Sequence, residues 1–128
     1  DTAQIRKDLE YYIAKVPVKK TPAMSKSVYS VLYARLGKAE QALHYFYDSY
    51  LPNLNPPFRV IAEFNGGTNP YFITGAGGTL QAIIFGFAGL EITDKGLKQV
   101  YTPILPKEWS SLTIRVAGKE IVHVNKNE

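Results

Sequence analysis

One segment restricts the possible folds of this chain more than any other. Residues 79–89, "TLQAIIFGFAG", are predicted to form a helix with almost no polar face. A helix that is apolar all round must be covered on every side. The longest apolar run, residues 80–90, is shorter than the roughly 20 residues that a membrane helix needs. We therefore expect a helix buried within protein, and no membrane association.

A chain of 128 residues has little material left to cover such a helix. The sequence also begins in a polar segment, and its first methionine is Met24, so no signal peptide is recognisable. Both features predict that the chain is a piece of a longer protein. Its principal partner would then be the missing N-terminal part of the same polypeptide.

Composition excludes several classes of function. Apolar residues make up 45% and charged residues 20%, as in ordinary globular proteins. The net charge of +4 is scattered rather than gathered into a basic stripe, so we expect no nucleic-acid partner. The chain has no cysteine, and neither His44 nor His123 has another ligand type nearby at metal-binding spacing. We expect no metal and no cofactor.

The periodicity of apolar residues changes once along the chain. Three amphipathic helices are predicted first. One runs from a cap at Thr2 to a stop at Pro17, one from an N-cap at Thr21 to Gly37, and one ends before Pro52. Beyond Gly89 the pattern alternates, with turns at 94–96 and 118–119, and predicts antiparallel strands. The fold class is therefore α+β. Trp109, between these strands, is expected to anchor a core or an interdomain contact rather than to bind a sugar.

The segment 52–78 is long, poor in regular signals and therefore a candidate functional loop. Its "VIAEF" strip holds Glu63 between apolar neighbours, an arrangement that can tune a carboxylate for proton transfer. The alternative is a solvent-facing strand residue.

The loop that follows Glu63 is rich in hydrogen-bonding groups, namely Asn65, Thr68, Asn69 and Tyr71. Paired glycines allow the backbone to approach a ligand, and aromatic rings such as Phe58 or Phe72 suit the apolar faces of sugars. A turn-rich connector explains the same composition. The later "GAGGTL" lacks the third glycine of a dinucleotide fingerprint, so we expect these glycines to start the buried helix and let it pack closely.

The joined sequence "RVIAEFNGGTNPYFITGAGGTLQAIIFGFAGLEIT" resembles the C-terminal part of family 65 of the glycoside hydrolases, which includes trehalose- and kojibiose-cleaving enzymes and disaccharide phosphorylases. The resemblance runs through most of the chain and is strongest from about residue 56 to residue 105. It implies the last helices and active-site loop of an (α/α)6 barrel over residues 1–88 and the start of a small β-sandwich over 89–128.

The resemblance also implies a chemistry. Family hydrolases act with inversion, using one carboxylic acid on the leaving oxygen and one carboxylate on water. By its place in the motif, Glu63 would be the general base and the acid would lie upstream, so the isolated piece is expected to be inactive. The substrate would be a glucoside such as trehalose or kojibiose. A periplasmic or secreted location is compatible with the resemblance, which leaves the compartment open.

Two other functions are compatible with the sequence. A non-catalytic carbohydrate-binding or scaffold module would use the same loop without chemistry. A disaccharide phosphorylase would admit phosphate in place of the base and water, and a glutamate at position 63 favours hydrolysis over this alternative.

Overall fold

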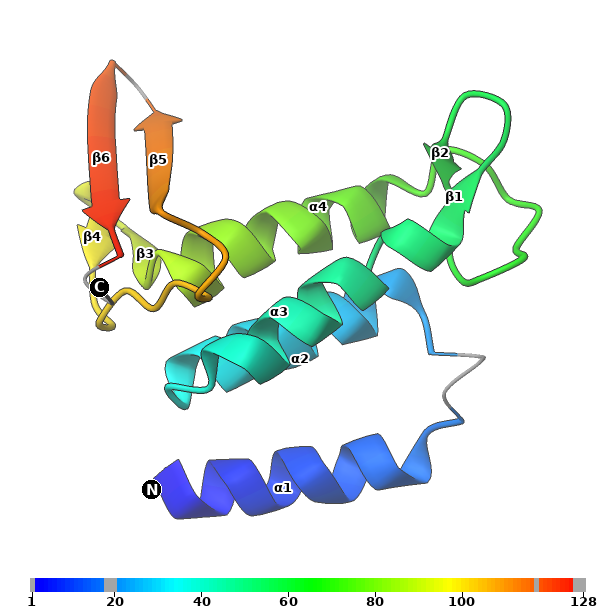
Figure 1. Ribbon diagram of the computed structural model, residues 1–128, viewed down its shortest axis with the longest axis horizontal. Helices are drawn as coiled ribbons and strands as arrows, with labels where there is room; N and C mark the ends of the chain where they lie inside the picture. Colours follow the sequence, from blue (N-terminus) through cyan, green and yellow to red (C-terminus); the bar gives the residue numbers. More distant parts are fainter. Residues whose placement is uncertain (1, 18–20, 117, 126–128) are drawn as a thin grey trace.

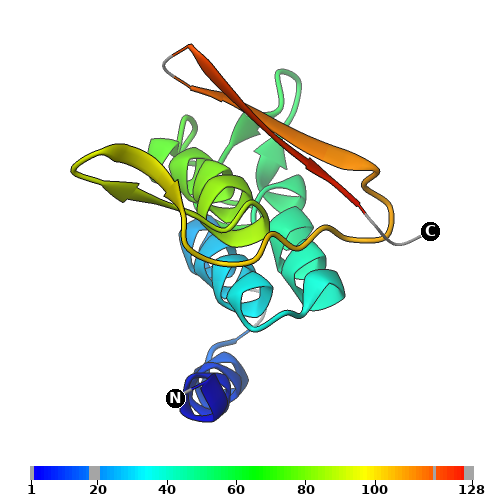
Figure 2. The ribbon, with the colours of Figure 1, turned by 90° about the vertical axis from the view of Figure 1, so that its left-hand side faces the viewer.

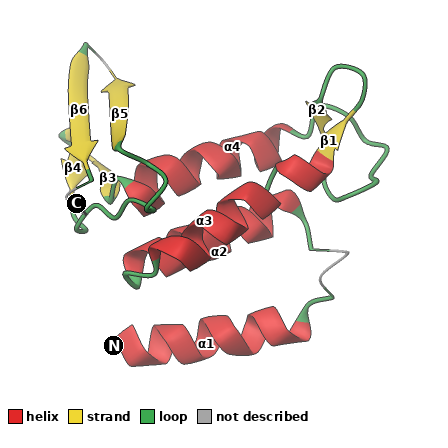
Figure 3. Ribbon diagram, in the orientation of Figure 1, coloured by secondary structure: helices red, strands yellow, loops and turns green. Residues whose placement is uncertain are grey.

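The computed structural model describes residues 2–17, 21–116 and 118–125. Its helices are α1 (Thr2–Lys15), α2 (Ala23–Arg35), α3 (Ala39–Asp48) and α4 (Ile73–Gln81), with the short 3₁₀ helix η2 (Leu51–Asn53) and the π-helical extension η3 (Ala82–Phe87). The strands are β1 (Leu54–Asn55), β2 (Val60–Ile61), β3 (Leu90–Thr93), β4 (Gly96–Gln99), β5 (Ser111–Val116) and β6 (Lys119–Val124). The α+β class is confirmed (Figure 3). In this part of the chain no helix is long and apolar enough to cross a membrane.

The strands form three separate antiparallel pairs, β1–β2, β3–β4 and β5–β6. The β3–β4 pair turns at Asp94 and Lys95, within the predicted turn at 94–96. In the β5–β6 pair Gly118 lies in the turn as predicted, whereas Lys119 already belongs to β6. The two larger hairpins lie at one end of α4 and the β1–β2 pair at the other (Figures 1 and 2). The helices therefore separate the loop that carries Glu63 from the β region.

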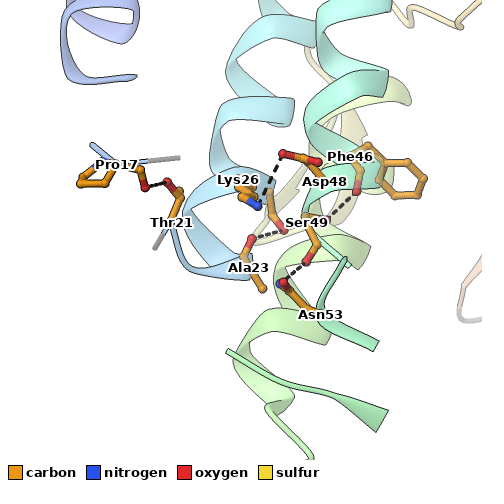
Figure 4. Close-up of polar contacts among 9 residues, drawn as sticks. Pro17, Thr21, Ala23, Lys26, Phe46, Asp48, Ser49 and Asn53 are labelled. Atoms are coloured by element: carbon orange, nitrogen blue, oxygen red, sulfur yellow. Dashed lines mark hydrogen bonds and ion pairs between the residues drawn. The ribbon is translucent and has the colours of Figure 1, made fainter. Parts of the chain in front are cut away.

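One helix end follows the predicted local chemistry, and two predicted caps are wrong. Gly37 ends α2 with a positive φ of 72°, a conformation that favours glycine after a helix. Thr21 does not cap α2 as the sequence predicted, because Pro22 occupies the N-cap position and the Thr21 hydroxyl donates to the Pro17 carbonyl instead, at 3.1 Å (Figure 4). The predicted cap at Thr2 is also wrong, since Thr2 is already helical.

Small residues bring α2 and α4 together. A Cβ atom at Gly78 would lie 3.0 Å from the Ser27 hydroxyl oxygen, and one at Gly75 would lie 3.0 Å from the Cβ of Ala23. Gly75 and Gly78 thus let the helix pack closely, as predicted, whereas Gly77 faces open space. Because the side chains here are short, the two helix backbones approach directly.

The core lies between the helices and the start of the β region. It is built from a cluster of buried residues: Ala34, Ala42, Leu43, Phe46, Ala82 and Phe87. The Trp109 ring packs on this cluster, with its centroid 4.7 Å from that of Phe87 and 5.7 Å from that of Phe46. Trp109 is therefore a core anchor, as the sequence predicted.

A polar layer joins the helices beside this core. Lys26, only 6% exposed, forms an ion pair with Asp48 at 3.5 Å (Figure 4). The fully buried Asn53 donates to the Ser49 carbonyl at 3.3 Å, and the Ser49 hydroxyl lies 3.2 Å from that of Thr79. These contacts fix η2, and with it the start of the β1–β2 segment, against α2 and α4.

The coverage of α4 differs from the sequence expectation. Leu80 is 60% exposed and Ile73 is 82% exposed, although the segment was expected to be covered on every side. Gly78, Ala82 and Phe87 are buried as expected. The described residues thus cover one side of α4 and leave apolar groups on another.

Candidate active site

The loop that carries Glu63 is closed at its base by backbone hydrogen bonds. The Phe72 amide donates to the Ile61 carbonyl at 2.9 Å, so the two ends of the intervening segment lie side by side. Compact surface loops whose ends meet in this way are frequently functional. The loop is held to the helices at its first residues, since the Ala62 amide donates to the Asn53 carbonyl at 2.8 Å.

Glu63 is half-buried and follows β2 in a bend, so it is not the solvent-facing strand residue of the alternative interpretation. Its backbone carbonyl accepts a hydrogen bond of 2.7 Å from the Ala23 amide, at the first turn of α2. Its carboxylate is within 3.5 Å of the Asn69 side-chain amide, which donates to Oε2. Among the described residues, the ion pairs join other side chains and leave Glu63 without a cationic partner.

The other predicted site residues lie on the same loop and point to solvent. Asn65, Thr68 and Asn69 are exposed, and Tyr71 is 76% exposed. The structure brings Asn69 to Glu63, whereas no such contact joins Asn65 or Thr68 to that carboxylate among the described hydrogen bonds. The loop therefore offers one carboxylate with the Asn69 amide beside it, and further accessible hydrogen-bonding groups elsewhere along the loop.

Aromatic groups flank the loop in two different environments. Phe58 is 84% exposed, whereas Phe72 is half-buried and its ring lies over Gly75.

Two residues near the loop have a left-handed backbone conformation. Tyr71 has a φ of 59° and Arg59 a φ of 54°, and this conformation costs a residue with a Cβ atom roughly 1–2 kcal/mol. Such backbone conformations are concentrated at functional sites and turns.

One contact of this loop was not predicted from the sequence. The Asn55 side-chain amide donates to the carbonyl of the buried Gly67 at 2.8 Å. Asn55 was part of a proline- and asparagine-rich connector with no distinguishing signal. Gly67 belonged to a glycine pair that indicated close backbone approach without naming the neighbour.

The residues described here contain no cluster of His, Asp and Glu that could hold a metal ion. His44 is exposed on α3. His123, on β6, is half-buried, and desolvation lowers its pKa below the usual 6.5.

Comparison with known proteins gives this loop a context. The chain is 54% identical over 120 residues to a kojibiose hydrolase of Mucilaginibacter mallensis and 57% identical over 121 residues to one of Flavobacterium johnsoniae. Each match covers 94% of this chain and 18% of the relative. The resemblance to family 65 of the glycoside hydrolases is confirmed.

A third relative carries a different activity in its name. An alpha,alpha-trehalose phosphorylase of Geobacillus stearothermophilus is 31% identical over 124 residues, covering 94% of this chain and 15% of the relative. No family model matches the chain. The chain thus spans less than a fifth of the length of these relatives.

Proposed function

We propose that this chain is the C-terminal part of an inverting α-glucoside hydrolase that acts on a glucose disaccharide. The observation that carries the proposal is the identity of 54–57% to two kojibiose hydrolases over 94% of the chain. Identity to the trehalose phosphorylase is 31%, which favours hydrolysis over phosphorolysis. In this proposal residues 1–88 complete an (α/α)6 barrel and residues 89–128 begin a β-sandwich.

Glu63 is the proposed general base. Its carboxylate accepts a proton from the water that attacks the anomeric carbon, while an acid outside this chain protonates the leaving oxygen. Carboxyl groups in inverting enzymes stand about 6.5–9.5 Å apart, which leaves room for that water. The lack of a cationic partner for Glu63 among the described residues supports this role, because most acceptor sites of the carboxylate remain for the reacting water.

The loop residues supply the proposed sugar contacts. Asn65, Thr68, Asn69 and Tyr71 offer amide and hydroxyl groups to the hydroxyls of a glucosyl unit or to the reacting water. Their exposure and their place on the same closed loop as Glu63 support the assignment. The partners of the chain would be this disaccharide and the N-terminal part of the polypeptide.

The base assignment is tested in the full-length polypeptide with Glu63→Gln. We expect kcat on kojibiose to fall by about a thousandfold, because proton transfer by a positioned group contributes on the order of 10²–10⁴ to the rate. Glu40→Gln, which alters an exposed carboxylate on α3, is the matched control and should retain activity. Near-normal hydrolysis by Glu63→Gln would remove Glu63 from the mechanism.

A second measurement separates loss of the base from loss of the fold. Azide carries no proton that must be removed during attack, so it should restore cleavage in Glu63→Ala and yield a glucosyl azide of inverted configuration. Glucose released by the unaltered enzyme should appear first as the β-anomer.

The two alternatives predict different results. A phosphorylase would need inorganic phosphate for cleavage and would release glucose 1-phosphate, and a binding module would retain a sugar without cleaving it. Assays with and without phosphate therefore decide between the three functions.

A further inference from the structure

The backbone of Glu63 is fixed from two sides. Its carbonyl accepts the Ala23 amide at 2.7 Å, and the preceding residue, Ala62, is fully buried and donates to the Asn53 carbonyl. The remaining freedom of Glu63 lies in its side-chain torsions. A base must be held close to its productive geometry, so a further contact on the carboxylate itself is needed.

Asn69 provides that contact. Its Nδ2 atom lies 3.5 Å from Glu63 Oε2, at the long end of hydrogen-bond distance. Catalytic hydrogen bonds are often long in unliganded enzymes and shorten when substrate binds. A neutral amide orients the carboxylate without pairing its charge. An ionised carboxylate has about four acceptor sites, so most remain for the reacting water.

Gly67 determines where the Asn69 side chain can lie. A Cβ atom at Gly67 would be 3.1 Å from Asn69 Oδ1 and 3.0 Å from the Phe64 carbonyl oxygen. The Asn69 amide therefore occupies space that a side chain at position 67 would crowd. Its Oδ1 rests beside Gly67 while Nδ2 faces Glu63.

Asn55 in turn holds Gly67. Its amide donates to the Gly67 carbonyl at 2.8 Å, while the Gly67 amide donates to the Phe64 carbonyl at 2.9 Å. Asn55 is itself placed by pairing with Val60 across β1 and β2. A series of contacts thus connects the β1–β2 pair through Gly67 and Asn69 to the carboxylate of Glu63.

We propose that Asn69 is a positioning residue for the carboxylate of Glu63, and that Asn55 and Gly67 keep Asn69 in place. The inference rests on the proposed role of Glu63 as general base. It narrows the role proposed above for Asn69, from a contact with the sugar or the water to an action through Glu63, and leaves the sugar contacts to Asn65, Thr68 and Tyr71. A misplacement of about 1 Å can cost on the order of a hundredfold in rate, so these contacts affect kcat rather than binding.

The test compares Asn69→Leu and Asn55→Leu in the full-length polypeptide, each in the unaltered and in the Glu63→Ala background. In the unaltered background we expect kcat on kojibiose to fall about ten- to a hundredfold with KM little changed. In Glu63→Ala, with azide as the nucleophile, we expect neither substitution to change the rate further. A residue that acts through Glu63 has nothing to position once that carboxylate is absent.

Two control variants separate positioning from general stability. Thr93→Val removes a hydrogen bond of the same kind and length, from the Thr93 hydroxyl to the Gly96 carbonyl at 2.8 Å, in the turn between β3 and β4. It should leave kcat unchanged. Gly67→Ala should lower kcat as Asn69→Leu does, whereas Gly77→Ala, which meets open space, should not.

Three outcomes are decisive against these assignments. Equal losses in both backgrounds would show that Asn69 contacts the sugar, and would overturn the inference while Glu63 remains the base. Unchanged kcat in both Asn69→Leu and Gly67→Ala would overturn it as well. Activity of Glu63→Ala without azide would instead overturn the proposed function.

Discussion

At the scale of single residues, environment rather than residue type determines what the polar groups of this chain can do. Glu63 and Glu91 are both half-buried carboxylates, but Glu91 lies 3.2 Å from the Arg35 guanidinium, whereas Glu63 lies beside a neutral amide. Glu91 is committed to an ion pair between α2 and β3. Glu63 keeps most of its hydrogen-bond acceptor sites, which a proposed base requires.

His123 gives a prediction at the same scale. Desolvation lowers its folded-state pKa below 6.5, so the unfolded chain binds the proton more readily. Its contribution to the free energy of unfolding is therefore complete above about pH 6.5 and decreases as the pH falls towards the folded-state pKa. We expect His123→Phe to reduce this loss of stability between pH 7.5 and pH 5, measured by thermal unfolding. His44→Phe, at an exposed site, is the control. Parallel pH curves for His123→Phe and the unaltered protein would contradict this.

At the scale of elements, α2 and α4 can pack closely because the side chains between them are very small. The hydroxyls that lie there are satisfied locally, with Ser27 donating to the Ala23 carbonyl at 3.1 Å and Thr79 to the Gly75 carbonyl at 3.1 Å. Close approach of two helices is thereby achieved without burying unpaired polar groups. The same contact places the N-terminus of α4 beside the loop that carries Glu63 (Figure 1).

Gly78→Ala tests this close approach. The added methyl group would meet Ser27 Oγ at 3.0 Å and Ser27 Cβ at 3.1 Å, so the helices must separate slightly. Overpacking of this kind costs about 1–3 kcal/mol, and we expect a lower free energy of unfolding in chemical denaturation.

Gly77→Ala is the matched control, one position earlier on the same helix. It meets open space and should stabilise the protein by up to about 1 kcal/mol, because alanine favours a helix over glycine. Equal effects of the two substitutions would show that helix propensity rather than packing determines the change in stability caused by Gly78→Ala.

At the scale of the whole molecule, an aromatic contact and an ion pair are among the contacts that join the helices to the β region in the described part of the chain. One is the aromatic group of Trp109 on Phe46 and Phe87. The other is Arg35, whose guanidinium lies 4.3 Å from the centre of the Tyr101 ring and pairs with Glu91. Since the β1–β2 pair is at the far end of α4, these contacts can be weakened without touching the Glu63 loop (Figure 1).

Trp109→Ala should therefore lower the stability of the protein without altering the candidate site. Loss of a large aromatic side chain from a core costs about 3–5 kcal/mol, and the half-buried position of Trp109 places the expected loss near the lower value. We expect a reduced free energy of unfolding, while the full-length polypeptide, assayed below its unfolding transition, keeps its KM for kojibiose. Val124→Ala, at a residue 67% exposed, should change stability little. A large change in KM in Trp109→Ala would show that the two ends of the molecule are coupled.

The sequence by itself determined the helices and the two larger hairpins, because apolar periodicity and turn residues are local properties of the chain. The base role proposed for Glu63 rests on the resemblance of its motif to family 65, and the β1–β2 pair was not predicted. The sequence also indicated that Gly75, Gly77 and Gly78 serve close packing, which is confirmed for Gly75 and Gly78 and wrong for Gly77. It did not indicate that Asn55, Gly67 and Asn69 meet near Glu63, that Lys26 is buried against Asp48, or that α4 leaves Leu80 and Ile73 exposed. Those facts depend on which distant segments pack together. Only the tertiary structure decides them, because a hydrogen bond or a buried face needs a partner that local sequence does not name.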